Sequence, residues 1–328
     1  MSAAAPTAPG RAGGGAAALV VGEALVDVVH AGGTTREHPG GSPANVALGL
    51  GRLGRPARLL TRLVDDERGR RVLEHLRASG VELAAPLLPA AEGVRTSTAQ
   101  AHVGADGGAR YEFDLEWSLP VDVVDEVLAP LDGRRPLVVA TGSLGTALEP
   151  GGAQVARLLE ALRPTTTVVY DPNLRPTIIG PAEEVRAGVE ALVGTADVVK
   201  MSAEDAEWLF PDRAPEETAR SWLGLGPALV VLTRGGEGSL ALCAAGEVDQ
   251  PGLAVDVADT VGAGDSFTGG LVDALWSADL LGADRREALA RVGTEVLTAC
   301  VAAAAEVAAV TVSRPGADPP TREELGRG

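Results

Sequence analysis

Three small residues precede an aspartate in the run Gly262-Ala263-Gly264-Asp265. An apolar strand candidate ends near Val257, and helical character follows the aspartate, so the run is expected to turn the chain from a strand into a helix. Small residues let backbone N–H groups crowd around an anion, and a helix N-terminus adds partial positive charge. Asp265 would lie beside that anion, where its carboxylate could accept a proton from an attacking hydroxyl. These residue types therefore predict the chemistry of phosphoryl transfer.

The same residues also have a purely structural interpretation. Glycine supplies the geometry of a strand-to-helix turn, and aspartate is common in the first turn of a helix. A second glycine-rich turn, Gly40–Gly54, weighs against that interpretation because it also leads into a helix, far away in the sequence. Two such turns in one chain are more specific than either alone.

In order and spacing, the two turns resemble the paired signatures of the ribokinase-like carbohydrate kinases, the PfkB family. The resemblance covers roughly residues 18–320, nearly the whole chain. It implies an α/β fold, with a doubly wound, mostly parallel sheet and a small β-sheet lid over a sugar. It also implies ATP-dependent phosphorylation of a sugar hydroxyl. Asp265 would be the general base, and the N–H groups of Gly262, Ala263 and Gly264 would form the anion hole.

The resemblance assigns sugar-binding roles to residues near the first glycine turn. Asp27, after the first strand candidate, would accept hydrogen bonds from sugar hydroxyls. Gly40 and Gly41 would let the backbone approach the sugar, and Asn45 offers both a donor and an acceptor. The alternatives are a solvated turn carboxylate at Asp27 and a helix-start residue at Asn45.

A further segment, Asp171–Pro176, follows another strand candidate. Its pattern resembles the fructokinase and 2-keto-3-deoxygluconate kinase branches more than ribokinase, and Gly142-Ser143 supports the same branch because ribokinases tend to carry Gly-Glu there. Arg175 would then bind substrate or a phosphate. Alternatively, Asp171 and Arg175 pair only with each other and shape the loop.

Two more segments match the family's nucleotide and metal elements. Thr233, Gly235 and Gly238 fit the T-x-G-x-x-G loop that the family uses around the nucleotide, although alone they indicate only a hairpin turn. Ser202 and Asp205 replace the Asn and Glu of an Asn-x-x-Glu element that helps to organise Mg²⁺ and phosphate. Asp205 would therefore act on the metal through water, and a plain capping motif explains both residues nearly as well. The resemblance also allows a monovalent cation such as K⁺.

Charge and composition argue against several classes of partner. A net charge of −17 disfavours nucleic acid and anionic membrane, which both reward basic patches. Lys200 is the only lysine and no P-loop lysine follows a glycine loop, so replacing Lys200 is expected to leave most kinase activity. Cys243 and Cys300 show no paired spacing, and the four histidines show no metal-ligand spacing, which favours a reduced, cytoplasmic protein.

Short apolar runs alternate with amphipathic helical stretches along most of the chain, as is typical of a doubly wound sheet. In such a sheet, ligands gather beyond the carboxyl ends of the strands. The expected strands are 19–21, 57–60, 137–140, 167–170, 198–199 and 229–232. The expected helices are 45–53, 68–78, 153–162, 182–192 and 203–209.

Two segments break this alternation. Val26–Pro39 and Arg95–Pro120 have the pattern of β-hairpins, with turns at Gly32-Gly33 and Asp106–Gly108, and they are predicted to form the lid rather than ordinary surface hairpins. Tyr111, Phe113 and Trp117 fall in the second segment and are expected to share one face. They would either cover the sugar or pack the lid against the main domain or a second subunit.

The remaining boundaries follow from composition. Residues 1–17 are predicted to be a disordered tail, 18–320 one kinase domain with lid segments at about 26–39 and 95–120, and 321–328 a C-terminal tail. The apolar stretch 296–312 is interrupted by Glu306 and is short for a membrane span, so it is expected to be a buried helix that leads to a strand.

The resemblance favours a fructokinase-type enzyme that converts D-fructose to fructose 6-phosphate, with ATP and Mg²⁺. It also allows a homodimer formed through the lid. 2-Keto-3-deoxygluconate kinase, ribokinase and nucleoside kinase activities are the alternatives within the enzyme class. A sugar-binding regulator without turnover is the alternative from another class, and the intact turn that ends in Asp265 argues against it.

Overall fold

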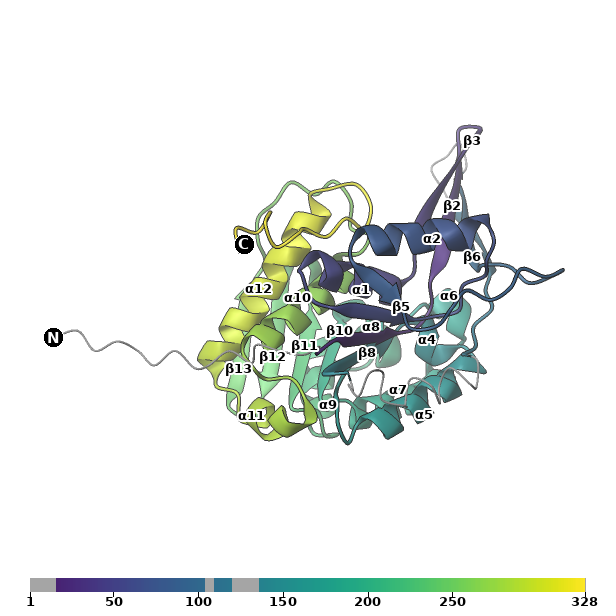
Figure 1. Ribbon diagram of the computed structural model, residues 1–328. Helices are drawn as coiled ribbons and strands as arrows, with labels where there is room; N and C mark the ends of the chain where they lie inside the picture. Colours follow the sequence, from purple (N-terminus) through teal and green to yellow (C-terminus); the bar gives the residue numbers. More distant parts are fainter. Residues whose placement is uncertain (1–15, 104–108, 120–135, 328) are drawn as a thin grey trace.

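A computed structural model describes residues 16–103, 109–119 and 136–327. Within these ranges, a large sheet lies between two layers of helices, and a small four-stranded sheet stands at one side (Figure 1). The doubly wound α/β class and the additional small sheet expected from the sequence are both confirmed.

The large sheet has nine strands in the order β13-β12-β11-β10-β9-β8-β1-β4-β5 among the described residues. Strands β11 to β5 of this order are parallel, and the hairpin β12-β13 adds an antiparallel edge. The six strands expected at 19–21, 57–60, 137–140, 167–170, 198–199 and 229–232 are all present. The bounds are β1 Ala18–Val21, β4 Ala57–Leu60, β5 Val81–Leu83, β8 Val138–Gly142, β9 Thr167–Asp171, β10 Val198–Ser202, β11 Leu229–Thr233, β12 Gly238–Cys243 and β13 Gly246–Pro251.

Continuous apolar runs form these strands because both faces of the sheet are buried. In β1, Val20 faces one core with α1, α10 and α12, whereas Leu19 and Val21 face the other core with α5 and α7. The helices are α1 Ser42–Arg52, α2 Glu67–Ala78, α4 Leu144–Ala147, α5 Gly151–Leu162, α6 Pro176–Ile179, α7 Ala182–Thr195, α8 Ala203–Leu209, α9 Pro215–Leu223, α10 Ala263–Ser277, α11 Arg286–Ala290 and α12 Thr294–Val312.

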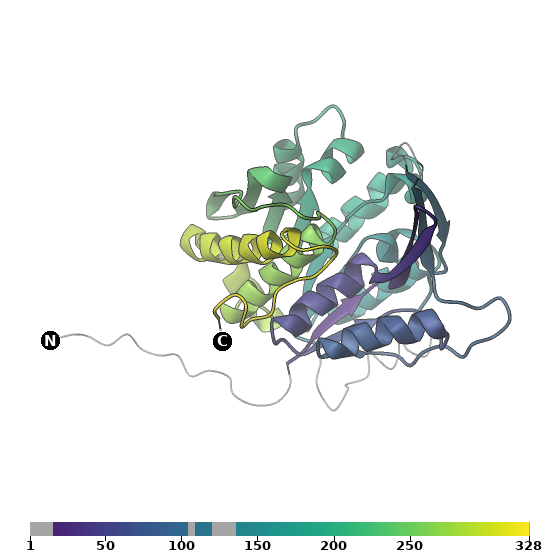
Figure 2. The ribbon, with the colours of Figure 1, turned by 90° about the horizontal axis from the view of Figure 1, so that it is seen from above.

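The small sheet has the order β3-β2-β6-β7 and is built from the two segments that break the alternation (Figure 2). Its strands are β2 Leu25–Ala31, β3 Thr34–Gly40, β6 Thr98–Val103 and β7 Ala109–Asp114. The β2-β3 turn lies at Gly32-Gly33 as expected, and β2 and β6 pair in parallel. The turn expected at Asp106–Gly108 and nearly all of the predicted N-terminal tail lie outside the described residues.

Two expected strands are absent from the described part of the chain. The strand expected to end near Val257 is wrong: β13 ends at Pro251, and Val257 is 63% exposed in an irregular segment. Gly and Asp, which strands disfavour, are frequent in this segment, and the amides of Ala258 and Asp259 donate to the carbonyl of Val312. No strand follows α12 within residues 313–327, where three prolines remove backbone donors.

The apolar stretch 296–312 does form a helix, α12, which packs along α10 (Figure 2). By length and composition, α12 is the one helix among the described residues that could cross a membrane, and 39% of the relevant window is buried inside the fold. A helix in the core of a soluble protein can be as long and as apolar as a membrane span, so this finding is weak evidence for one.

Candidate active site

The carboxyl ends of five parallel strands meet at one edge of the large sheet. The register places Gly142 beside Asp171 and Ser202 beside Thr233, while β1 ends beside β8 at Val21. The predicted segments that follow these strands are therefore neighbours in space. Helices α1 and α10 pack against each other, and the side chains at their N-termini meet.

Asp265 lies in the first turn of α10 and is only 7% exposed. The hydroxyl of Ser42 donates to its Oδ1 at 2.6 Å, and Nδ2 of Asn45 donates to its Oδ2 at 2.8 Å. The two glycine turns singled out in the sequence thus meet at one carboxylate. Ser42 was not assigned a role from the sequence, although its place directly after two glycines at a helix start was a usable signal.

The turn before Asp265 is fixed by its neighbours. Gly262 has φ 76, a left-handed conformation that favours glycine. Asp259 accepts hydrogen bonds from the amides of Val261 at 3.0 Å and Gly316 at 2.8 Å, and these bonds lower the pKa of the Asp259 carboxyl. The first N–H groups of an α-helix have no partner within the helix, so the start of α10 offers donors suited to an anion, although the amide of Ala263 already lies 3.3 Å from the carbonyl oxygen of Thr260.

At the other end of the candidate site, Asp27 lies half-buried in β2, opposite His38 of β3. Burial raises its pKa, while His38 and Arg175 oppose the shift. A Cβ added to Gly40 would collide with Oδ2 of Asp27, so a side chain there would force the Asp27 carboxylate to move. Arg175 is exposed, and its Nη1 donates to Oδ1 of Asn173 at 2.7 Å.

The alternative in which Asp171 pairs with Arg175 is wrong. Nζ of Lys200 lies 3.0 Å from Oδ2 of Asp171, and the hydroxyl of Thr268 lies 2.9 Å from the same oxygen. Asp171 and Lys200 are both buried. Burial raises the pKa of Asp171 to about 6, although Lys200 opposes the shift. A single lysine within an apolar strand was the sequence signal for such a pair, because a buried lysine needs a partner.

Glu23 is a second acidic group that the sequence reading left without a role. It follows β1, is 6% exposed, and its Oε2 accepts from the amide of Gly145 at 2.7 Å. Burial raises its pKa to about 7, against hydrogen bonds that include one from Ser143 and against the charge of Arg175. The site therefore holds a carboxyl group that titrates near neutral pH.

We expect Glu23 to make the stability depend on pH. Its ordinary pKa is 4.5, so the folded protein holds this proton more tightly than the unfolded chain does. The resulting stabilisation is fully present below about pH 4.5 and is lost as the pH rises through about 7. Relative to the wild type, Glu23→Gln should gain about 3 kcal/mol in free energy of unfolding across this range. Urea unfolding at several pH values measures this difference, with Glu160→Gln as an exposed control; parallel pH curves for Glu23→Gln and wild type would contradict it.

Asp205 is held by local hydrogen bonds. Its Oδ2 accepts from the amide and the hydroxyl of Ser202, and its Oδ1 accepts from the amide of Leu174 at 2.8 Å. With the amide of Asp205 donating to the Ser202 hydroxyl, this is the capping box that the sequence allowed as the alternative. Among the described residues, no three His, Cys, Asp or Glu side chains form a group that could hold a metal ion.

The predicted nucleotide loop joins β11 to β12 as an antiparallel hairpin. The amide of Arg234 donates to the carbonyl of Gly238 at 2.7 Å, and the Thr233 hydroxyl donates to the carbonyl of Met201 at 3.3 Å. Thr233 lies directly beside Ser202, so the hairpin begins at the same sheet edge as Asp205. Gly235 is exposed at the tip of the loop.

The expectation that three aromatic residues share one face of a lid strand is wrong for Trp117. Strand β7 ends at Asp114, and Trp117 is buried in the core with its Nε1 donating to the carbonyl of Gly145 at 2.8 Å. Phe113 lies on β7 and is 38% exposed. The side chain of Tyr111 lies outside what the structure describes. For Trp117, packing against the main domain is the interpretation that holds.

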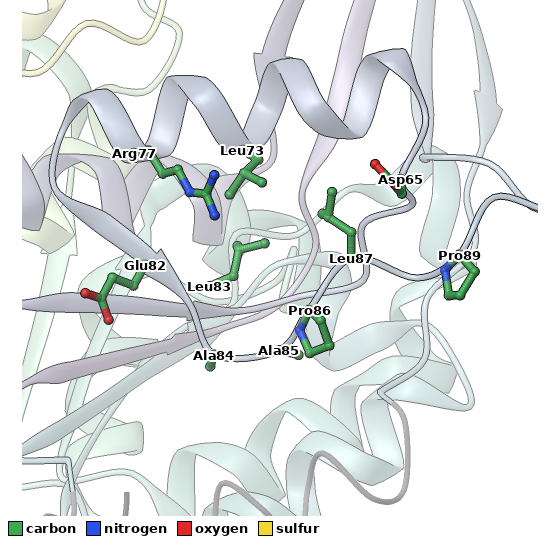
Figure 3. Close-up of a pocket in the computed structure, with 10 residues that line it drawn as sticks. All are labelled: Asp65, Leu73, Arg77, Glu82, Leu83, Ala84, Ala85, Pro86, Leu87 and Pro89. Atoms are coloured by element: carbon green, nitrogen blue, oxygen red, sulfur yellow. The ribbon is translucent and has the colours of Figure 1, made fainter. Parts of the chain in front are cut away.

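A hollow of about 890 Å³ lies between α2 and the segment 82–89 (Figure 3). Leu73 and Arg77 line it from α2, and Leu83 and Leu87 line it from the opposite segment. None of the residues predicted for the site lines it. It therefore does not mark the edge where Asp265, Asp171 and Glu23 gather.

Comparisons with known proteins identify the family of the chain. Residues 17–324 match the family described as pfkB family carbohydrate kinase. The chain is 32% identical over 268 residues to a fructokinase of Rhizobium leguminosarum bv. trifolii, covering 80% of this chain and 81% of that one. It is 31% identical to a Klebsiella pneumoniae fructokinase, with 78% and 83% covered. A fructokinase double mutant from Vibrio cholerae O395, in fructose, ADP and potassium ion bound form, has a TM-score of 0.74 at 25% identity, with 92% and 94% covered.

Proposed function

Because the chain belongs to the pfkB family of carbohydrate kinases and is a sugar kinase, we propose that it converts D-fructose and ATP to fructose 6-phosphate and ADP. The main support for phosphoryl transfer is the Asp265 carboxylate in the first turn of α10, which accepts hydrogen bonds from Ser42 and Asn45 of α1. Fructokinases among the relatives, and the fructose named for the Vibrio cholerae structure, support the choice of sugar.

In the proposed reaction, the sugar hydroxyl oxygen attacks the γ-phosphorus of ATP, and the bond to the ADP oxygen breaks. The hydroxyl proton passes to Asp265, whose two carboxylate oxygens are held in place by Ser42 and Asn45. The amides of the turn 262–264 stabilise the negative charge of the transferred phosphoryl group. Alignment and electrostatics supply most of the catalysis, since the transition state needs little covalent help.

For the sugar, we propose contacts from Asp27, Gly40, Gly41 and Arg175. Asp27 and Arg175 lie close enough for the arginine charge to oppose the burial-driven rise in the pKa of the Asp27 carboxyl, so an acceptor and a donor would face the hydroxyls together. Asn45 already donates to Asp265, and in this proposal it orients the base while its carbonyl oxygen serves the sugar. The small sheet would act as a lid that excludes water.

Thr233, Gly235 and Gly238 are proposed to contact the nucleotide from the hairpin between β11 and β12. Mg²⁺ would neutralise charge on the ATP phosphates, and such an ion usually needs only one or two protein carboxylates. Both oxygens of Asp205 are engaged by Ser202 and Leu174, so the arrangement fits contact through water. We extend the proposal to K⁺ because the Vibrio cholerae relative is described with a potassium ion.

A panel of sugars in a coupled ADP-release assay tests the function. Fructose should give the highest kcat/KM, and ribose, 2-keto-3-deoxygluconate and a nucleoside should give lower values. A higher kcat/KM for 2-keto-3-deoxygluconate than for fructose would identify this sugar acid as the preferred substrate. Sugar binding without ADP release would support the alternative of a sugar-binding regulator without turnover.

We also propose that the chain forms a homodimer through the small sheet. Strands β3 and β7 are the edges of that sheet, and an open edge can pair with a second copy. Phe113 on β7 adds an apolar side chain that is 38% exposed. Light scattering after size-exclusion chromatography measures the mass, and a monomer at assay concentrations would contradict this part of the proposal.

A further inference from the structure

Lys200 is buried inside the site although the chemistry so far gives it no task. Its side chain is 3% exposed, and its ammonium lies 3.0 Å from Oδ2 of Asp171, which is 6% exposed. Burying two charges costs desolvation free energy that their attraction seldom exceeds, so a buried ion pair is weak support for stability alone. Moreover, Oδ1 of Asp171 is buried without a hydrogen-bond partner among the described residues. Because stability alone does not explain this arrangement, the ion pair points to a task in the candidate site.

The pair is tied to the first turn of α10. The hydroxyl of Thr268 lies 2.9 Å from Oδ2 of Asp171 and 3.0 Å from the carbonyl oxygen of Gly264. A Cβ added to Gly264 would lie 2.9 Å from Nζ of Lys200, so the ammonium rests against this glycine. Gly264 belongs to the proposed anion hole and precedes Asp265.

The ammonium also carries its charge in this place. Burial lowers the pKa of Lys200, but the carboxylates of Asp171, Asp205 and Asp265 outweigh burial and hold the pKa above its ordinary value. Lys200 therefore provides a fixed positive charge within the fold. The Asp171 carboxylate and the strand β10 leave it little freedom to move.

We propose that Lys200 is a positioning residue for phosphoryl transfer: held by Asp171, its ammonium supports the turn at Gly264 and adds positive charge behind the anion hole. This inference rests on the proposed function. It replaces the expectation from the sequence that Lys200 is dispensable, which considered only a lysine in direct contact with phosphate. Lys200 acts through the helix N-terminus, and Thr268 connects the ion pair to the same turn.

The test compares Lys200→Met with a matched control, Arg286→Met. Arg286 pairs with the buried Asp197 at 2.6 Å, at the opposite end of β10, and was given no role in the site. Lys200→Met should lower kcat by roughly 10- to 100-fold with sugar KM within about twofold, because the sugar contacts lie elsewhere. Arg286→Met should leave the kcat of the folded protein unchanged while lowering the unfolding midpoint.

A second measurement does not depend on turnover. Calorimetry with MgATP and MgADP should show that Lys200→Met weakens ATP binding about tenfold and ADP binding less than about threefold, since the lost charge lies behind the turn that is proposed to hold the transferred phosphoryl group. Thr268→Val keeps the ion pair and removes the hydroxyl, so it should lower kcat roughly fivefold and provides the test if Lys200→Met does not fold.

Equal weakening of ATP and ADP by Lys200→Met, or wild-type kcat in both Lys200→Met and Thr268→Val, would overturn the role of Lys200. A loss of kcat in Arg286→Met as large as the loss in Lys200→Met would also overturn it. A wild-type protein that releases no ADP with any sugar would contradict the proposed function instead, and the two nucleotide affinities would still decide the role of Lys200.

Discussion

Replacement of Asp265 by Asn is expected to lower kcat by roughly 10²- to 10⁴-fold, the usual contribution of a general base. The amide cannot take the hydroxyl proton, yet it has the shape of the carboxylate and can still accept from Ser42 or Asn45 through its oxygen. The fold should therefore survive, and sugar KM should change little. Steady-state kinetics of ADP release, together with the unfolding midpoint, measure both parts of this expectation.

Asp273→Asn is the matched control for this prediction. Asp273 lies further along the same helix and is also buried. It pairs with Arg55 and Arg322 instead of Ser42 and Asn45, and it was assigned no role in the site. Its loss should lower stability and leave the kcat of the folded protein nearly unchanged. If Asp265→Asn kept near wild-type turnover, Asp265 would be removed from the mechanism, and if both variants lost kcat equally, the loss at Asp265 would be structural.

The sequence predicted which segments meet at the candidate site better than it predicted the contacts between their side chains. Buried parallel strands need apolar side chains on both faces, so runs such as those in β1 and β11 are visible in a single sequence. Once the strands are parallel, their carboxyl ends must share an edge, which places Asp171 and Ser202 at the ends of neighbouring strands. This is why the general location of the site followed from the pattern of short apolar runs.

The side-chain partners could not be read in the same way. Asp265 and Ser42 are separated by 223 residues, and only the packing of α1 against α10 brings them together. Asp171 was given Arg175 as its alternative partner because the two are close in sequence, whereas Lys200 reaches it across neighbouring strands. Trp117 was wrongly placed on β7 because period-two spacing says nothing of where a strand ends.

The second large effect is expected at the sugar end of the site. There, Asp27→Ala should lower kcat/KM for the sugar by an amount that corresponds to a loss of about 2–4 kcal/mol of transition-state stabilisation. Asp27 is half-buried in β2, and burial raises its pKa while His38 and Arg175 oppose the shift. The carboxylate is thus already held beside positive charge without a ligand. Removing it would leave sugar hydroxyls without their acceptor and Arg175 without its neighbouring charge.

The nucleotide should be little affected by this change, because its proposed contacts lie at the hairpin that begins at Thr233. Calorimetry with MgATP and kinetics over a range of fructose concentrations separate the two ends of the site. Asp27→Asn keeps an acceptor and should lose less than Asp27→Ala. Asp114→Asn removes a carboxylate of the same small sheet that pairs with Arg95 on the exposed side, and it should leave the kinetics unchanged. Equal damage to ATP binding and sugar use in Asp27→Ala would indicate that Asp27 holds the small sheet in place, because only a structural change would reach both ends together.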